Sequence, residues 1–116
     1  MTLQRYETGP RMSKAVSYNG TVFLSGLTTS DTTLGTEDQT TNILAEIDRL
    51  LTLAGTDKTR LLTAQIWLRD IADFDKMNRA WEAWVAAGAT PVRATTESRL
   101  ANPAFLVEIQ VSAALA

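Results

Sequence analysis

The chain has 116 residues, a mass of 12.7 kDa and a formal net charge of -2, with 45% apolar and 21% charged residues. This size predicts one domain over residues 1–116, with the composition of an ordinary soluble globular protein. The sequence contains no Cys and no His, which excludes disulfides, thiolate nucleophiles, Cys/His zinc sites and triads that need an imidazole. The acidic balance argues against nucleic-acid binding through neutralised phosphates.

No stretch of about 20 apolar residues is present, so we expect no membrane span. Residues 1–16 contain no apolar run of the length of a signal-peptide core, and we therefore expect a cytoplasmic protein. No acidic cluster favours a carboxylate-bound metal, and no glycine-rich phosphate loop favours a nucleotide.

A β-hairpin is predicted around Asn19-Gly20, because both residues tolerate the positive φ angles of a tight turn. It joins strands over Lys14–Tyr18 and Thr21–Leu27. The apolar run Val22-Phe23-Leu24 indicates that both faces of the second strand are covered. The following residues, Thr28–Thr41, are rich in Thr, Asp and Gly and are predicted to form one surface loop.

Apolar residues at helical spacing predict a first helix from Thr40 or Thr41 to Ala54, ended by Gly55 in a left-handed conformation. A strand follows over Leu61–Leu68, and both of its faces hold large apolar side chains. One face is expected to hold Leu62, Ala64, Ile66 and Leu68, and the other Leu61, Thr63, Gln65 and Trp67.

A second helix is predicted to begin after Asp70 or Asp73, either of which can cap it, and to end before Gly88 and Pro91. Its aromatic residues are interpreted as core residues and not as a ligand cage, because their spacing is that of a buried helix face. One stripe of this helix consists of Phe74, Met77, Asn78, Trp81, Trp84 and Val85.

Two further strands are predicted over Val92–Ser98 and Phe105–Ala114, with Pro103 in the turn between them. The order of elements predicts an α+β fold in which two helices pack on one face of a mostly antiparallel sheet. The other face is expected to hold apolar residues, among them Leu61, Trp67 and Leu106. Because so much apolar surface is rarely left in water, we expect a cyclic homo-oligomer that buries this face.

Arg93 and Glu108 form a candidate carboxylate site at the start of one C-terminal strand and within the next. If these strands pair through the turn near Pro103, both side chains stand on the face without helices. The Arg fork matches a carboxylate through two parallel bonds, and a partly desolvated Glu can orient water or exchange a proton. From the spacing alone, a cross-strand salt bridge is the alternative.

Three segments near the C-terminus resemble the signature of the RidA/YjgF family, the reactive intermediate deaminases: Pro91-Val92-Arg93-Ala94, Arg99-Leu100 and Val107-Glu108-Ile109. Supporting segments make the resemblance extend over almost the whole chain. They are Phe23-Leu24-Ser25-Gly26, Gln39-Thr40-Thr41-Asn42-Ile43-Leu44, and Trp67-Leu68-Arg69-Asp70 with Phe74 and Asn78.

The resemblance implies a chorismate-mutase-like fold, a homotrimer, and sites in clefts between subunits. It also implies a cofactor-free, metal-free hydrolase that converts small 2-imino acids and their enamine tautomers, such as 2-iminopropanoate and 2-aminoacrylate, to 2-keto acids and ammonium. Carboxylate binding then falls to Arg93 and water positioning to Glu108. Ser25 and Gly26 are expected to line the pocket, with Asn78 supporting it.

The sequence departs from the family pattern at three positions. Met12 falls where the archetypes have Tyr, Thr95 where many relatives have Cys, and Thr96 at a usually apolar position. We therefore expect Met12 and Thr95 to line the pocket and to change the character of its wall. The Arg93 fork is retained. A protein of another class remains open, namely a trimer that binds a small carboxylate metabolite without turnover. Ribonuclease activity, attached to some relatives, is disfavoured by the lack of His and of a basic stripe.

Overall fold

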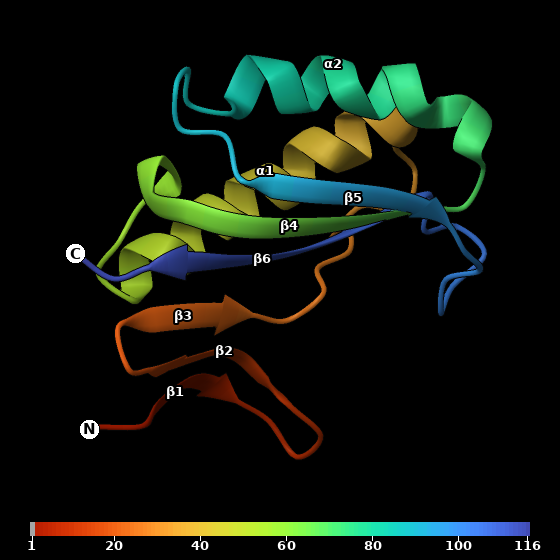
Figure 1. The fold of residues 1–116 in the computed structure, drawn as a ribbon. Coiled ribbons are helices and arrows are strands. Elements are labelled where there is room, and N and C mark those ends of the chain that lie inside the picture. The colour runs from red at the N-terminus through yellow and green to blue at the C-terminus, as the bar shows by residue number, and fades with distance from the viewer. Residues whose placement is uncertain (1) are drawn as a thin grey trace.

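The structure is a computed structural model that describes residues 2–116 and contains one six-stranded sheet with the strand order β1-β2-β3-β6-β4-β5 (Figure 1). The elements are β1 (Gln4–Thr8), β2 (Ser13–Tyr18), β3 (Thr21–Leu24), α1 (Thr36–Leu53), β4 (Leu61–Leu68), α2 (Phe74–Trp84), β5 (Val92–Glu97) and β6 (Val107–Ala114). Short 3-10 helices, Lys58–Arg60 and Ile71–Asp73, precede β4 and α2. Every strand pair is antiparallel except β4–β5.

Both helices lie on the same side of the sheet, where α1 packs against β6, β3 and α2 (Figure 1). The predicted α+β class, with two helices on one face of a mostly antiparallel sheet, is confirmed. The core between the layers is mainly aliphatic, and complete burial of each aliphatic side chain stabilises the fold by about 2 kcal/mol. Its fully buried members include Ile43, Ile47, Leu50, Ile66, Leu68 and Ile109. No helix within residues 2–116 is long and apolar enough to cross a bilayer.

Two predicted turns are confirmed by their backbone angles. Asn19 and Gly20 have φ of 54° and 79°, as a tight hairpin turn between β2 and β3 requires. Gly55 has φ of 87° and donates its N–H to the carbonyl of Thr52, while Thr56 donates to the carbonyl of Leu51. These bonds satisfy carbonyls at the end of α1 that the helix itself leaves unpaired.

The first helix begins at Thr36, four or five residues before the predicted start at Thr40 or Thr41. The buried face of this first turn is polar, so it shows no apolar periodicity. Gln39 and Thr40 are completely buried, and the Thr40 hydroxyl donates to the Thr36 carbonyl at 2.7 Å. Glu37 and Asp38 also lie in the first turn, where the helix dipole favours negative charge.

Strand β1 is absent from the sequence-based prediction, because its residues alternate poorly between apolar and polar. It is an edge strand that pairs only with β2, and four of its five residues are exposed. Its pairing therefore depends on backbone hydrogen bonds, which leave no mark in the hydrophobic pattern.

The predicted faces of β4 are wrong at its beginning. A register irregularity between Leu61 and Thr63 places Leu61 opposite Ala113, where Leu61 is buried in the core, whereas Leu62 is 43% exposed. A bulge of this kind exchanges the faces of the residues before it. From Thr63 onward the predicted alternation holds, and Trp67 stands on the face without helices, opposite Glu108.

The face without helices is open in the single chain. Phe23 is 54% exposed and Val92 is 71% exposed on this face, and Trp67 is half-buried. A shallow hollow of about 480 Å³ lies there, lined by side chains that include Phe23, Thr63, Gln65 and Gln110.

Candidate active site

The side chain of Arg93, the second residue of β5, contacts one face of α2. Its Nη1 donates a hydrogen bond of 2.8 Å to Oδ1 of Asn78. Its guanidinium carbon lies 5.3 Å from the ring centre of Trp81 and 5.8 Å from that of Phe74. The three α2 residues are spaced at i, i+4 and i+7, so one helix face supplies all of these contacts.

The Arg93 guanidinium has no carboxylate partner within residues 2–116. The ion pairs there join Arg49 to Glu7 and Glu46, Lys76 to Asp73, and Arg79 to Glu37. Burial lowers the pKa of Arg93, and the charge of Glu82 opposes this effect. Because an arginine pKa lies so far above neutrality, the side chain remains charged. A half-buried charged fork with unused donors is suited to binding an anion.

Thr95 lies two residues after Arg93 in β5 and therefore on the same face of that strand. Its Oγ1 is buried and has no hydrogen-bond partner within residues 2–116. A buried hydroxyl without a partner costs about 1–3 kcal/mol. A bound polar molecule that reached Thr95 would therefore gain a hydrogen bond for which no protein group competes.

Glu108, the second residue of β6, lies on the face of the sheet without helices and pairs with Trp67 of β4. Burial raises the pKa of its carboxyl group. The carboxylate lies against the backbone of Gly26, where an added Cβ would overlap its Oε2. Glycine at position 26 is therefore what leaves room for the Glu108 side chain.

The predicted pairing of the Arg93 and Glu108 strands is wrong, because β4 lies between β5 and β6. Arg93 is opposite Ala64 on the helix-covered face, whereas Glu108 is opposite Trp67 on the other face. The two side chains thus point away from each other across the sheet. For the same reason, the cross-strand salt bridge that the spacing allowed is not formed.

The connection from β5 to β6 crosses the end of β4 and is held by two side chains to which the sequence pattern assigned no role. Arg69 donates to the carbonyls of Phe105 and Asn102, both at 2.9 Å. The buried Gln39 amide donates to the Ala104 carbonyl and accepts from the Leu106 N–H. Both residues lie in segments that carry the family resemblance, which was the only signal for them in the sequence.

A second pocket, of about 700 Å³, lies between α1 and the segment that follows β3. Its lining brings together three of the predicted site residues, Met12, Ser25 and Gly26. Ser25 Oγ is buried and lacks a hydrogen-bond partner within residues 2–116.

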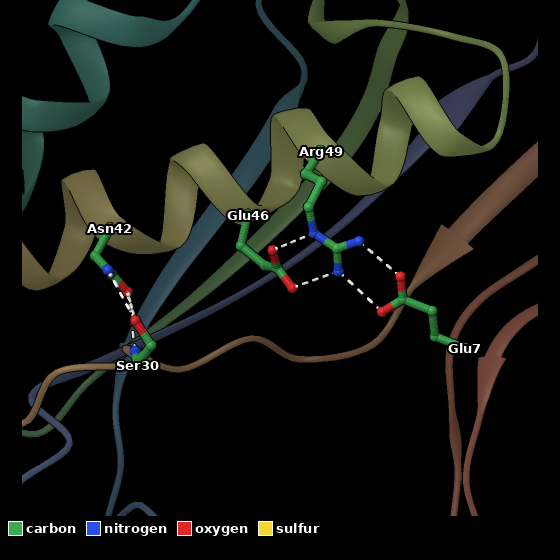
Figure 2. A network of polar contacts seen from close by, with 5 residues as sticks. All are labelled: Glu7, Ser30, Asn42, Glu46 and Arg49. Carbon is green, nitrogen blue, oxygen red and sulfur yellow. Dashed lines mark hydrogen bonds and ion pairs between the residues drawn. The ribbon is translucent and has the colours of Figure 1, made fainter.

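The wall of this pocket on the side of α1 is a network of polar contacts. Figure 2 shows Arg49 between two carboxylates, donating to Glu46 at 2.7 and 2.9 Å and to Glu7 at 2.6 and 2.9 Å. These bonds lower the pKa of both carboxyl groups. Farther along α1, Asn42 accepts from the backbone N–H of Ser30 at 2.9 Å (Figure 2). The network joins the β1–β2 hairpin and the segment after β3 to α1.

The predicted site residues therefore form two groups in one chain. Arg93, Asn78 and Thr95 lie at β5 and α2, at one edge of the sheet. The others, Met12, Ser25, Gly26 and Glu108, gather around the end of β3. Strands β6 and β4 separate β3 from β5, which corresponds to about 14 Å at the usual strand spacing. Within residues 2–116, no cluster of three or more Asp or Glu side chains that could hold a metal is present.

These features define a small α+β protein with a half-buried arginine near one edge of its sheet that has no carboxylate partner within residues 2–116. A family model described as endoribonuclease L-PSP matches residues 2–115. The chain belongs to this family, whose members are also called YjgF, RutC or RidA proteins.

Two relatives match over nearly the whole length of both chains. The chain is 41% identical to the RutC family protein YoaB of Escherichia coli strain K12, over 99% of this chain and 100% of that protein. The crystal structure of NMB1025, a YjgF family member from Neisseria meningitidis, is 46% identical, with a TM-score of 0.95 over 100% of this chain and 97% of that one. Reactive Intermediate Deaminase A of Arabidopsis thaliana is 29% identical over 89% of this chain and 58% of that protein.

Proposed function

We propose that this protein hydrolyses small 2-imino carboxylates and their enamine tautomers to 2-keto acids and ammonium, without a cofactor. The observation that carries the proposal is the state of Arg93, a charged and half-buried fork whose hydrogen bond to Asn78 leaves its other donors unused. A fork of this kind recognises the one group that all these substrates share, the carboxylate. The name of the Arabidopsis relative supports the chemistry.

In the proposed reaction, Arg93 binds the carboxylate through two parallel hydrogen bonds and so fixes the position of the C=N carbon. A water beside Glu108 adds its oxygen to that carbon and gives up a proton to the Glu108 carboxylate. The nitrogen takes up a proton, and the resulting carbinolamine expels ammonia as its hydroxyl becomes the carbonyl of the keto acid. A raised pKa suits Glu108 to both accepting and returning the proton. Positioning supplies most of the acceleration.

One chain does not bring Arg93 and Glu108 to a single small substrate, because they lie on different strands and opposite faces. We therefore propose a homotrimer with sites between subunits. In each site the Arg93 group of one copy faces the Glu108 group of the next. Exposure of Phe23 and Val92 on the open face supports such an assembly, since association would bury them.

The alternative is a trimer that binds a small carboxylate metabolite without converting it. Met12 favours this alternative, because this residue, which is 51% exposed, lines the second pocket where the family pattern has a Tyr hydroxyl. In both cases we propose a small carboxylate ligand and neither a nucleic-acid nor a membrane partner.

The test is an assay in which an amino-acid-oxidising enzyme generates 2-iminopropanoate in place and semicarbazide traps it. We expect the wild-type protein to divert the imine to pyruvate before trapping, and the Arg93→Ala variant not to do so. Pyruvate binding that depends on Arg93, without hydrolysis of any imino acid, would instead establish the binding protein. Full activity in folded Arg93→Ala would refute Arg93 as the carboxylate-binding residue, both for the hydrolase and for the binding protein.

A further inference from the structure

We propose that Phe74 and Trp81 are positioning residues for Arg93, whose rings set the direction in which its unused donors face the ligand. The proposal rests on the carboxylate-binding role of Arg93 proposed above. It gives these two aromatic residues of α2 a role in ligand binding, beyond the core packing that the sequence predicts for them.

The geometry places both rings within the range of a cation–π contact, which extends to about 6 Å. The guanidinium carbon of Arg93 is 5.3 Å from the centre of the Trp81 ring and 5.8 Å from that of Phe74. Asn78, one turn from each ring along the helix, adds a hydrogen bond of 2.8 Å from Arg93 Nη1 to its Oδ1. Two rings and one amide thus contact the guanidinium from the same helix face.

The kind of contact matters because it conserves hydrogen-bond donors. A guanidinium has five N–H donors, and Asn78 uses one of them. The aromatic rings hold the cation through its charge and need none of its N–H groups. A carboxylate in their place would hold Arg93 equally well, but would occupy the donors and neutralise the charge that the ligand needs. The rings therefore orient the side chain and leave its binding edge unused.

Orientation before binding increases affinity, because immobilising an arginine side chain costs up to about 2 kcal/mol of rotamer entropy. In this chain that cost is met during folding and not by the ligand. The Trp81 ring is itself well fixed, since it is 5% exposed and lies 5.5 Å, centre to centre, from the ring of Trp84.

Core packing alone does not account for Phe74, which is 39% exposed at the first position of α2. Its replacement by Leu keeps the apolar volume near the core and removes the ring from Arg93. Phe74→Leu is therefore the decisive variant, and Phe74→Tyr, which keeps the ring, is its conservative partner. Trp84→Phe is the matched control, because the Trp84 side chain contacts Lys58 and Asp48 and not Arg93, and the Phe ring keeps an aromatic neighbour for Trp81.

The experiment measures the steady-state constants KM and kcat for each variant, with 2-iminopropanoate as the substrate, and the Kd for pyruvate. We expect Phe74→Leu to raise KM and Kd about three- to tenfold, the equivalent of one cation–π contact. We expect kcat to change less than about twofold, because Asn78 and the bound carboxylate still fix the guanidinium once the substrate is in place, so that the loss falls on binding. Phe74→Tyr should restore wild-type values. Trp84→Phe should lower the melting temperature and leave KM unchanged.

Trp81 is tested by Trp81→Leu against Trp81→Phe, with the same expectation, and the Phe74 pair decides the proposal if Trp81→Leu does not fold. A second readout is the Nε–Hε resonance of Arg93 in ¹⁵N-labelled protein. Ring currents should displace this resonance in the wild type, and Phe74→Leu should move it toward the position of a free arginine.

The outcomes separate this proposal from the proposed function. Loss of binding in Arg93→Ala, combined with wild-type KM, Kd and Arg93 resonance in Phe74→Leu, would overturn the positioning role and leave the carboxylate site standing. Wild-type binding and turnover in Arg93→Ala would overturn both. A KM increase of the same size in Trp84→Phe would show a general effect of loosening α2 and would also refute the proposal.

Discussion

The guanidinium of Arg93 donates a hydrogen bond, 2.8 Å long, to the neutral side-chain amide of Asn78. A neutral acceptor orients the cation and leaves its charge uncompensated within residues 2–116. In contrast, Arg49 is bound on two sides, by Glu46 and by Glu7 of β1, the strand at the opposite edge of the sheet from β5. Two arginines of one chain thus differ in state: one is saturated by protein carboxylates, and the other remains available to an external anion.

Asn78→Asp should convert Arg93 to the saturated state. The new carboxylate would pair with the guanidinium, and the affinity for pyruvate should fall about ten- to a hundredfold, as expected for loss of a charge-assisted bond. Asn78→Ala removes the acceptor without adding a charge and should cost less. Titration calorimetry with pyruvate compares the two variants, and equal losses would contradict the competition between carboxylates.

Arg93→Lys should keep the charge and lose most of the function. An ammonium is a point charge that cannot make the two parallel bonds of the fork, and it lacks the planar face that stacks on the rings. We expect kcat/KM to fall about tenfold or more, with a melting temperature close to that of the wild type. Steady-state kinetics on 2-iminopropanoate tests this, and near-wild-type activity would show that charge alone is sufficient.

Gly26→Ala should displace the Glu108 carboxylate, because the added methyl group would overlap Oε2. A carboxylate at the end of a flexible side chain moves at little cost, so the free energy of unfolding should change by less than about 1 kcal/mol. We expect kcat to fall about tenfold or more, since the proton acceptor leaves its position. Gly35→Ala is the matched control, because an added Cβ there meets open space.

The pH dependence of turnover should report Glu108, whose pKa is raised above the ordinary value of 4.5 by burial. The proton-accepting form is the ionised one, so kcat should increase as the pH rises through this pKa and then level off. Glu108→Gln should remove this step along with most of the activity. A flat profile from about pH 4 upward in the wild type would argue against Glu108 as the proton acceptor.

The same group predicts the sign of a stability effect. Because its pKa is higher in the folded protein than in the unfolded chain, the folded protein binds more protons between 4.5 and the raised value. The contribution of Glu108 to stability is therefore most favourable below this window and decreases as the pH rises through it. Denaturant unfolding across this range compares the free energies of unfolding of the wild type and Glu108→Gln. As the pH increases, the wild type should lose stability relative to Glu108→Gln.

The sequence allowed prediction of those elements whose apolar residues repeat with a regular period. The apolar stripe of α2 and the alternating apolar residues of β6 predicted these two elements. The turns at Asn19-Gly20 and Gly55 were predicted from the backbone preferences of Asn and Gly. The edge strand β1 and the first turn of α1 carry polar residues and escaped prediction for that reason.

For the candidate site, the sequence predicted which residues take part but not how they lie relative to one another. Arg93 and Glu108 belong to consecutive strands, and pairing of neighbours in the sequence is the usual expectation. The insertion of β4 between them depends on tertiary packing and on the contacts of Arg69 and Gln39 with the connecting segment. Local sequence pattern does not encode such a crossing.

Two groups that are separated on one chain should become one hydrolytic site when two copies meet. Co-refolding equal amounts of Arg93→Ala and Glu108→Gln, each inactive alone, tests this most directly. With random assembly about a quarter of all sites in the sample would pair an intact Arg93 with an intact Glu108, so about a quarter of the wild-type 2-iminopropanoate hydrolysis should return. Mixed trimers, verified by mass spectrometry, that remain as inactive as the separate variants would contradict a site shared between copies.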